Sequence, residues 1–536
     1  MEDVNIYKNN QQAFRVSKDF PSFIFNMLGK KSSVYREEQQ ELYNCFALYL
    51  YGADFNVEGT SGDYIPSYIK FRKIKMLIDK EARFMFSQTP EIKISTTGET
   101  DEESTEKQSC ENIEMAVTQV LKKSSFSKTL LQAAKDCFVG KRVACVVDYS
   151  DLDGVLVHFY NSLQFYYETQ YGTNTLTKFV SFELVEDSTA LSDKVYMINE
   201  YNNDNGVVYV KSELYNGGGA LVETLVPETR TALEEIPAVV IINDGTLMNK
   251  KGMSDVLQLQ DKESGYSKLA NADIDSERKG MNPIRYTVDM NPATTSNLSS
   301  GAGAYWDLQH SDNVDSPSPQ VGTLSPQMNH TEAVKTTLDR LNTSMYDALE
   351  IPNINEETMA GTITSGKALK ALYYPLTVRC DEKYIVWEPA IEKVVDFIIK
   401  FLLLNARRCE VLYSVESLSM VAHEIQITKK YALLEDETEE KDTAINEVMN
   451  NVRSKKSYMK QYRDDLTTDA QIEEELLQIA EESNMMDAAT NPVLRSELDK
   501  TETQTNIDDD LEAMQTEGEG NGTSEVQIEQ IGTNAQ

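Results

Sequence analysis

Histidine and cysteine are scarce in this sequence. Its 536 residues contain four histidines and six cysteines, and no two cysteines have the short spacing of a metal-binding pair. A structural zinc site usually requires such pairs. We therefore expect no metal site and no cofactor, and we predict reduced thiols in a cytosol. The six cysteines are Cys45, Cys110, Cys137, Cys145, Cys380 and Cys409.

Long apolar runs are also absent. The most apolar helical stretch contains Asp396 and Lys400, so it does not reach the run of about 18 apolar residues that a membrane-spanning helix needs. The first thirty residues lack the apolar core of a signal peptide. We therefore predict a buried or interface helix instead of a membrane span, and no secretion.

Basic residues are few compared with acidic ones. The chain has 51 Lys and Arg against 87 Asp and Glu, which gives a net charge of -36. Such acidity argues against tight binding of nucleic acid over a broad surface, because phosphates are held by Lys and Arg. It does not exclude a protein through which nucleic acid passes. The hydrophobic content of 40% is sufficient for folded cores.

Motifs of catalysis are missing as well. The sequence contains no Gly-x-Ser-x-Gly turn, no glycine-rich phosphate loop before a lysine and no dinucleotide fingerprint. Acidic pairs such as Asp273 with Asp275 do not lie in a calcium-type loop. We predict no enzyme and no catalytic residue; a metal-dependent hydrolase that uses the surplus carboxylates is the least favoured alternative.

The central stretch of the chain runs from Asn329 to Ala406. Asn329 and Glu332 suit a capping box at the start of a helix, which Pro352 should stop. A polar loop with two glycines follows over residues 352–366, and from Lys367 a long helix should run to Ala406, kinked at its prolines. The first helix has an apolar seam of Val334, Leu338, Leu341, Met345 and Leu349; the prolines are Pro375 and Pro389.

Upstream, helical and strand patterns alternate. Helices are predicted over 35–52, 65–86 and 109–138, and strands over 91–95 and 142–149. From Gly154 to Asp244 the chain turns to β-structure, with a hairpin turn at Asn203-Asp-Asn-Gly206. The basic cluster at the start of the second helix indicates either a nucleic-acid or membrane surface or a solvated face, and we favour the solvated face. This cluster comprises Phe71, Arg72, Lys73 and Lys75.

A long and unusually polar helix is predicted over 252–279. Polar helices of this length rarely form alone, so we expect partner helices, which other subunits can supply. An insert over 281–327 follows, with short strands at 283–289 and 304–308. Beyond the long helix we predict a pair of strands at 410–415 and 424–428, helices at 439–460 and 469–482, and an acidic, disordered tail.

This order of elements resembles the portal proteins of tailed bacteriophages, the head-to-tail connector rings, over roughly residues 30–485. Three stretches carry the resemblance. Ile236-Pro-Ala-Val-Val-Ile-Ile-Asn-Asp leading into Met253-Ser-Asp-Val-Leu-Gln-Leu-Gln-Asp resembles the strand that enters the first stem helix. Thr364-Ser-Gly-Lys-Ala-Leu-Lys-Ala-Leu with Arg379-Cys-Asp-Glu-Lys-Tyr is similar to the start of the helix after the tunnel loop. The helix from Arg36 to Gly52 is similar to the early helix of the family.

The resemblance implies an α+β fold, predominantly helical, with portal architecture. It assigns residues 1–250 and 366–430 to the wing, 251–280 and 328–351 to the stem, 281–327 to the clip and 352–365 to the tunnel loop. Residues 431–484 become the crown, and 485–536 an acidic tail. The long kinked helix of the wing follows the tunnel loop.

The resemblance also implies function and partners. It implies a homo-oligomer, usually a dodecamer, at one capsid vertex of the virion, assembled in the host cytoplasm. Double-stranded DNA would be packaged and later ejected through the channel. The implied partners are the terminase large subunit, a head-completion adaptor protein, the major capsid protein and a scaffolding protein, with no membrane. The alternative is another virion or tail structural protein without a DNA channel.

Two groups of residues are expected to line such a channel. Polar loop residues would give weak, water-replaceable contacts that let duplex DNA slide. Lys335 and Arg340 on the returning stem helix would form sparse positive rings, or salt bridges between neighbouring subunits. The loop residues are Asn353, Asn355, Glu356, Glu357, Thr358, Met359, Thr362 and Thr364.

Overall fold

A computed structural model describes the chain as two compact units, residues 1–434 and 435–536. The residues described are 24, 32–57, 65–96, 105–173, 175–188, 190–281, 284–289, 320–324, 331–354, 366–415, 418–431, 437–463 and 471–479. Helices and strands are both abundant, so the α+β fold class is confirmed. The expected strand at 304–308, the cap at Asn329 and the acidic tail lie outside the described residues.

Among the described residues, the first part of unit 1 contains the helices α3 (Ser32–Tyr51), α4 (Lys73–Phe86), α5 (Thr105–Lys123) and α6 (Phe126–Gly140). Gly52 ends α3 as predicted, with a left-handed φ of 78° and its N–H donated to the carbonyl of Leu48 at 2.8 Å. The helix predicted over 109–138 is broken in two, because Ser125 is left-handed with a φ of 50°. The helix predicted over 65–86 begins only at Lys73, so that prediction is wrong for residues 65–72.

Two antiparallel sheets follow. The first has the order β3–β2–β9, formed by β2 (Arg142–Ser150), β3 (Gly154–Asn161) and β9 (Ala238–Ile242). The second has the order β4–β5–β6–β7–β8. Its strands are β4 (Phe165–Thr169), β5 (Leu176–Glu186), β6 (Val195–Asp204), β7 (Val207–Asn216) and β8 (Leu221–Arg230), and a 3-10 turn, η3 (Leu191–Asp193), precedes β6.

Two sequence predictions in the sheets are confirmed. The first six residues of β2 are all buried, as expected for an apolar run. The predicted hairpin turn joins β6 to β7, where Asp204 pairs with Val207. Asn205 and Gly206 lie between them with φ of 53° and 86°, which is the pattern of a type I′ turn.

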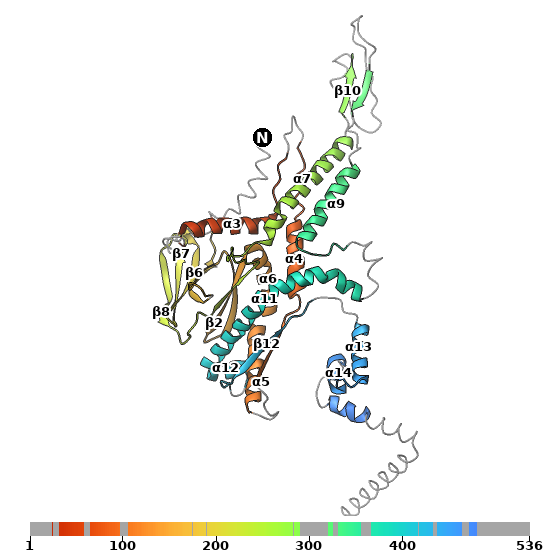
Figure 1. Cartoon of the computed structure of the whole chain (residues 1–536). Coiled ribbons are helices and arrows are strands. Elements are labelled where there is room, and N and C mark those ends of the chain that lie inside the picture. The colour runs from red at the N-terminus through yellow and green to blue at the C-terminus, as the bar shows by residue number, and fades with distance from the viewer. Residues whose placement is uncertain are drawn as a thin grey trace, which may run out of the picture. The chain divides into compact units, whose positions relative to one another are not determined.

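The polar helix α7 (Asp255–Met281) leads to the strand β10 (Ile284–Val288). Strand β11 (Gln320–Leu324) pairs with β10 in antiparallel register, and α9 (Thr331–Ala348) returns beside α7. Figure 1 shows α7 and α9 side by side, with the β10–β11 pair beyond their far ends. The predicted helix–insert–helix order is therefore present.

The long helix is α11 (Gly366–Leu404), which contains both Pro375 and Pro389 and is visibly bent (Figure 1). A second helix, α12 (Ala406–Tyr413), follows, and β12 (His423–Thr428) pairs with β1 (Glu91–Thr96). The predicted strand at 410–415 is therefore wrong. Cys409 and Tyr413 are both buried, and this spacing of four residues buries one face of a helix.

The main hydrophobic core of unit 1 joins α3–α6, the β3–β2–β9 sheet and α11. The apolar face of the second half of α11 is buried in it, as predicted. The buried residues there include Ile391, Val394, Val395, Ile398, Ile399 and Leu402. Across the described ranges, no helix combines the length and the apolar character that crossing a bilayer requires.

Unit 2 contains α13 (Glu437–Met449), α14 (Lys455–Tyr462) and a further helical segment at 471–479. The single helix predicted over 439–460 is interrupted, because Asn451 adopts a left-handed φ of 57°. Ser454 then caps α14 by accepting a hydrogen bond from the N–H of Ser457 at 3.1 Å.

Candidate functional site

The polar face of α7 binds a non-helical segment of its own chain, residues 65–72. The Asn271 side chain accepts from the N–H of Ile69 and donates to its carbonyl, both at 2.8 Å. Four residues further along α7, Asp275 accepts from the N–H of Ser67 at 3.0 Å. Backbone groups of Ser67 and Ile69 therefore pair with α7 side chains, which explains why this segment is not helical.

Glu263, also on α7, caps the start of α4. Its two carboxylate oxygens accept from the N–H groups of Lys73 at 3.1 Å and Ile74 at 3.2 Å. These are donors that a helix leaves unpaired at its first turn. Burial raises the pKa of Glu263, and the backbone donors oppose that rise. The polar side chains of α7 thus bind other segments of the same subunit, whereas the sequence predicted only partner helices for them.

A buried ionic cluster lies where α4, α7 and α11 meet. Glu81 of α4 and Asp255, the first residue of α7, are fully buried. Lys383 of α11 bonds Asp255 at 2.6 Å and Glu81 at 2.9 Å. Arg379, one turn earlier, contacts the same two carboxylates, each at 2.8 Å. Two cations face two anions, so the cluster is neutral.

The surroundings of Lys383 favour its charged form. Burial alone would lower the pKa of the ammonium, but the charges of Asp255 and Glu81 outweigh burial, so its pKa lies above its usual range. The ammonium also lies 3.6 Å from the centre of the Phe138 ring. The cluster therefore fixes the first turn of α7 to the long helix by charges held away from water.

The predicted seam of α9 faces inwards. Met345 and Leu349 are buried, while the other seam residues are half-buried. Lys335 and Arg340 are exposed, and their spacing of five residues places them on different sides of the helix. Within the described parts of the chain neither forms an ion pair, and Arg340 donates only to the carbonyl of Thr336 at 3.4 Å. Both are placed to meet a partner outside the subunit.

The basic cluster at the start of α4 differs from our expectation. Lys73 donates to the Asn342 side chain at 3.0 Å, and Lys75 donates to the Tyr49 hydroxyl at 2.9 Å. Phe71 packs edge-on against Tyr266, with 5.3 Å between the ring centres. The prediction of a solvated helix face is therefore wrong for Lys73 and Lys75, which join α4 to its neighbours, whereas Phe71 and Arg72 are exposed and precede the helix.

The expected tunnel loop is described only at its beginning. Pro352 follows the buried Ile351, and Asn353 is exposed. The remaining predicted channel residues of the loop lie outside the described residues. Those residues are Asn355, Glu356, Glu357, Thr358, Met359, Thr362 and Thr364.

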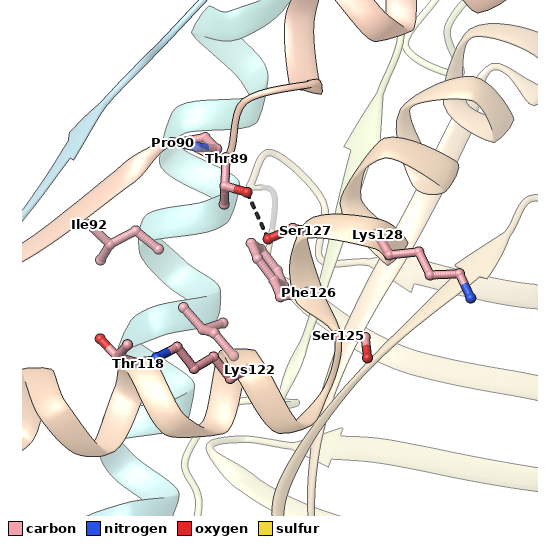
Figure 2. A pocket seen from close by; sticks show the side chains of 10 residues that line it. Thr89, Pro90, Ile92, Thr118, Lys122, Ser125, Phe126, Ser127 and Lys128 are labelled. Atoms are coloured by element: carbon pink, nitrogen blue, oxygen red, sulfur yellow. Dashed lines mark hydrogen bonds between the residues drawn. The ribbon is translucent and has the colours of Figure 1, made fainter.

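A cavity of about 470 Å³ lies between β1, α5 and the first turn of α6 (Figure 2). Ile92 and Phe126 line it, and the hydroxyl of Thr89 donates to that of Ser127 at 2.7 Å across its rim. Its titratable groups are lysines, without a carboxylate, histidine or cysteine. The described residues also contain no group of three or more metal ligands. This cavity thus lacks the acid and base of a hydrolytic site.

The ionic cluster was not predicted from the sequence. Arg379 and Lys383 are four residues apart and so share a helix face, and this spacing was the only local signal. Charged residues in such a pattern are usually solvated. Burial of Glu81 and Asp255 depends on contacts between segments far apart in the chain, which a single sequence does not show.

Comparison with known families gives an independent result. A family model described as "Phage portal protein, SPP1 Gp6-like" matches residues 62–488. No curated protein matches the chain. The matched range contains α7, α9, α11 and the ionic cluster, and it coincides closely with the range of the portal resemblance. The chain therefore belongs to the SPP1 Gp6-like family of phage portal proteins.

Proposed function

We propose that twelve copies of this portal protein form a ring at one capsid vertex and that viral DNA is packaged and ejected through its centre. The observation that carries the proposal is the order α7, β10–β11 pair, α9 and α11 within the family match. The family is one of structural capsid proteins, and the described residues offer no metal-binding group for a hydrolase.

We assign the portal regions to the elements as follows. The wing comprises residues 1–250 with 366–430, and the stem comprises 251–280 and 328–351, which contain α7 and α9. The clip is 281–327, which includes the β10–β11 pair, and the tunnel loop is 352–365. Residues 431–484 form the crown, and 485–536 the acidic tail. The pairing of α7 with α9 supports the assignment of the stem.

The exposed charges of α9 support a channel role for the stem. Lys335 and Arg340 are both exposed on α9, outside its apolar seam, so a ring would present each of them once per subunit. Sparse cations hold DNA phosphates only weakly in a chain of net charge -36. Together with the polar tunnel loop, they would permit sliding of the duplex. The salt bridge to a neighbouring subunit is the second possibility for each.

The partners proposed are those of a packaging vertex. The clip would dock the terminase large subunit during packaging and the head-completion adaptor protein afterwards. The wing would meet the major capsid protein and, during assembly in the host cytoplasm, a scaffolding protein. The alternative function is a virion or tail structural protein that binds only protein partners and has no DNA channel.

Electron microscopy and mass photometry of the purified full chain test the ring. We expect closed rings with a central hole and a mass of twelve times the subunit mass of 60.5 kDa. A population of monomers and irregular aggregates would contradict the proposal.

Deletion of residues 358–364 separates a channel from a purely structural ring. The shortened protein should still form rings but should package less DNA in a reconstituted assay with the terminase motor. The charge-reversed variant K335E keeps the loop and changes only a stem residue. Its DNA packaging, measured in the same assay, shows the effect of the stem contact alone. Normal packaging after the deletion would refute a channel role for this loop, whereas a wild-type ring through which no DNA is packaged would favour the alternative without a channel.

A further inference from the structure

A cavity of about 400 Å³ lies between α6 and β3, and it shares no residue with the cavity of Figure 2. Its size is in the range of cavities that hold small organic molecules. Lys123, Gln132 and His158 line it and are exposed, so the cavity is open to solvent on that side.

The inner wall of this cavity is apolar. Ala133 of α6, Val143 of β2 and Val157 of β3 line it and are buried. Leu156 and Phe159 extend this wall and are half-buried. A surface of this kind is favourable for a methylene chain, because contact with it removes apolar area from water.

One carboxylate lines the same cavity. Asp136 of α6 is half-buried there, and among the residues that the structure describes it forms no hydrogen bond and no ion pair. The ammonium of the preceding Lys135 is bound to Asp79 at 3.1 Å. Burial raises the pKa of Asp136 to about 6, so the carboxylate is ionised at pH 7.5. A carboxylate in such a position is stabilised by a cation that reaches it.

The other titratable groups of the lining leave Asp136 as its anion. Lys123 donates to the carbonyl of Asp153 at 2.5 Å and lies 3.6 Å from the carboxylate of that residue. Its charge is therefore compensated by Asp153. His158, on β3, is the remaining titratable group. The net charge of -36 on the whole chain also favours cations over anions as ligands.

The lining selects among cations. Calcium takes six to eight oxygen ligands and magnesium six, whereas this cavity has a single carboxylate. The described residues contain no group of three or more metal ligands here or elsewhere. One carboxylate beside an apolar wall fits instead an ammonium group carried on a hydrocarbon chain.

We propose that this cavity binds the primary ammonium group of a small aliphatic amine, with Asp136 as its counter-ion and its methylene chain against Val143 and Val157. The bound amine would join α6 to β3 and so stabilise the folded subunit by mass action. This site lies within one subunit and does not depend on ring formation. Failure of the proposed function would therefore leave the inference intact.

Calorimetric titration of the full chain at pH 7.5 and constant ionic strength tests the site. The probes are butylamine, butan-1-ol, which lacks the charge, and ammonium chloride, which lacks the chain. We expect butylamine to bind at one site per subunit, at least tenfold more tightly than either of the other two. D136N should weaken butylamine binding about tenfold or more, because it removes a charged hydrogen-bond partner. D187N removes the same charge at a side chain that is 72% exposed and should leave the affinity unchanged.

A second variant supplies the cation from the chain itself. Gln132 lines the cavity one helical turn before Asp136, so the lysine of Q132K would lie beside the carboxylate. Q132K should weaken butylamine binding as D136N does, and it should raise the melting temperature when no amine is present. Both variants remove an uncompensated charge and are expected to be at least as stable as the wild type, which circular dichroism would check. Loss of binding would then not arise from unfolding.

Three outcomes would overturn the inference. The first is equal affinity of the wild type and D136N for butylamine, and the second is an equal heat signal from sodium chloride. The third is binding of Nα-acetyl-lysine amide that is tighter than binding of butylamine, because it would assign the site to a lysine side chain of a partner protein and not to a free amine.

Discussion

Replacement of Lys383 by methionine tests the buried ionic cluster most directly. Methionine keeps an apolar side chain of similar length over Phe138 but removes the ammonium. Glu81 and Asp255, both fully buried, then retain Arg379 as their cationic partner. The two carboxylates lose contacts of 2.9 Å and 2.6 Å, and the cluster carries one uncompensated negative charge.

The magnitude follows from this burial. Removal of one partner from a buried ion pair typically costs about 3–5 kcal/mol, because the remaining charge stays buried without its counter-ion. The remaining Arg379 contacts both carboxylates, which reduces the loss. We therefore expect K383M to lower the free energy of unfolding by about 3 kcal/mol.

Lys393, on the same helix, provides a matched control. It bonds Glu235 at 2.7 Å, but both side chains are about half exposed. An exposed ion pair contributes about 1 kcal/mol or less, so K393M should be nearly neutral. Both ion pairs have similar lengths, and burial is therefore the variable that the comparison isolates.

Urea unfolding at pH 7.5 would measure both variants. Tryptophan fluorescence is a suitable signal, because Trp387 is buried and lines a small cavity together with Arg379 and Lys383. All samples need the same protein concentration, since assembly stabilises the folded chain by mass action. A loss of less than 1 kcal/mol for K383M, or an equal loss for K393M, would refute the reasoning.

Three further changes have defined outcomes. Burial raises the pKa of Asp136 to about 6, whereas the pKa of an aspartate in an unfolded chain is about 3.9. Between these two values the folded state binds a proton that the unfolded state has lost. The stability of the wild type therefore falls as the pH rises from 4 to 6. D136N should therefore be more stable than the wild type above pH 6, by about 1–3 kcal/mol, and as stable as the wild type near pH 4. Thermal unfolding at both pH values measures this difference. A stability gain of D136N that grows towards low pH would contradict the prediction. N271A leaves the N–H and the carbonyl of Ile69 without their partner and should lower the free energy of unfolding by about 2 kcal/mol. Amide hydrogen exchange at Ile69 should become faster, and an unchanged exchange rate there would count against the pairing. G206A places a side chain in open space at a φ of 86° and should lower the free energy of unfolding by about 1 kcal/mol, because of the backbone conformation alone. Urea unfolding measures this loss. The control is G218A, at a glycine outside the left-handed region, which should be nearly neutral.

The elements predicted correctly are those specified by local sequence. The apolar face of α11 could be read from residues three and four apart, because its contacts repeat with the helix period. The turn at Asn205 and Gly206 could be read because both residues tolerate positive φ. In these cases the tertiary structure agrees with the local preference, so the sequence alone was sufficient.

The errors have the opposite cause. Residues 65–72 have a helical pattern, but Asn271 and Asp275, about 200 positions later, bind backbone groups of this segment in a non-helical form. The segment at 410–415 contains strand-forming residues, yet Tyr413 is buried from a helix and its hydroxyl accepts from the N–H of Val155 at 2.9 Å. Contacts distant in the chain overrode local preference in both places.

The same long-range contacts determine how α7 is attached to the subunit. Its first residue, Asp255, is held by Arg379 and Lys383 of α11, and Glu263 caps α4 two turns later. Asn271 then binds the segment 65–72. The helix is thus fixed at intervals over most of its length, and its far end leads to β10. A force applied at the β10–β11 pair would therefore pass along α7 into α4 and α11, because no unattached turn at its base is free to bend. A stem built in this way would couple the clip, where we propose that the motor docks, to the long helix α11.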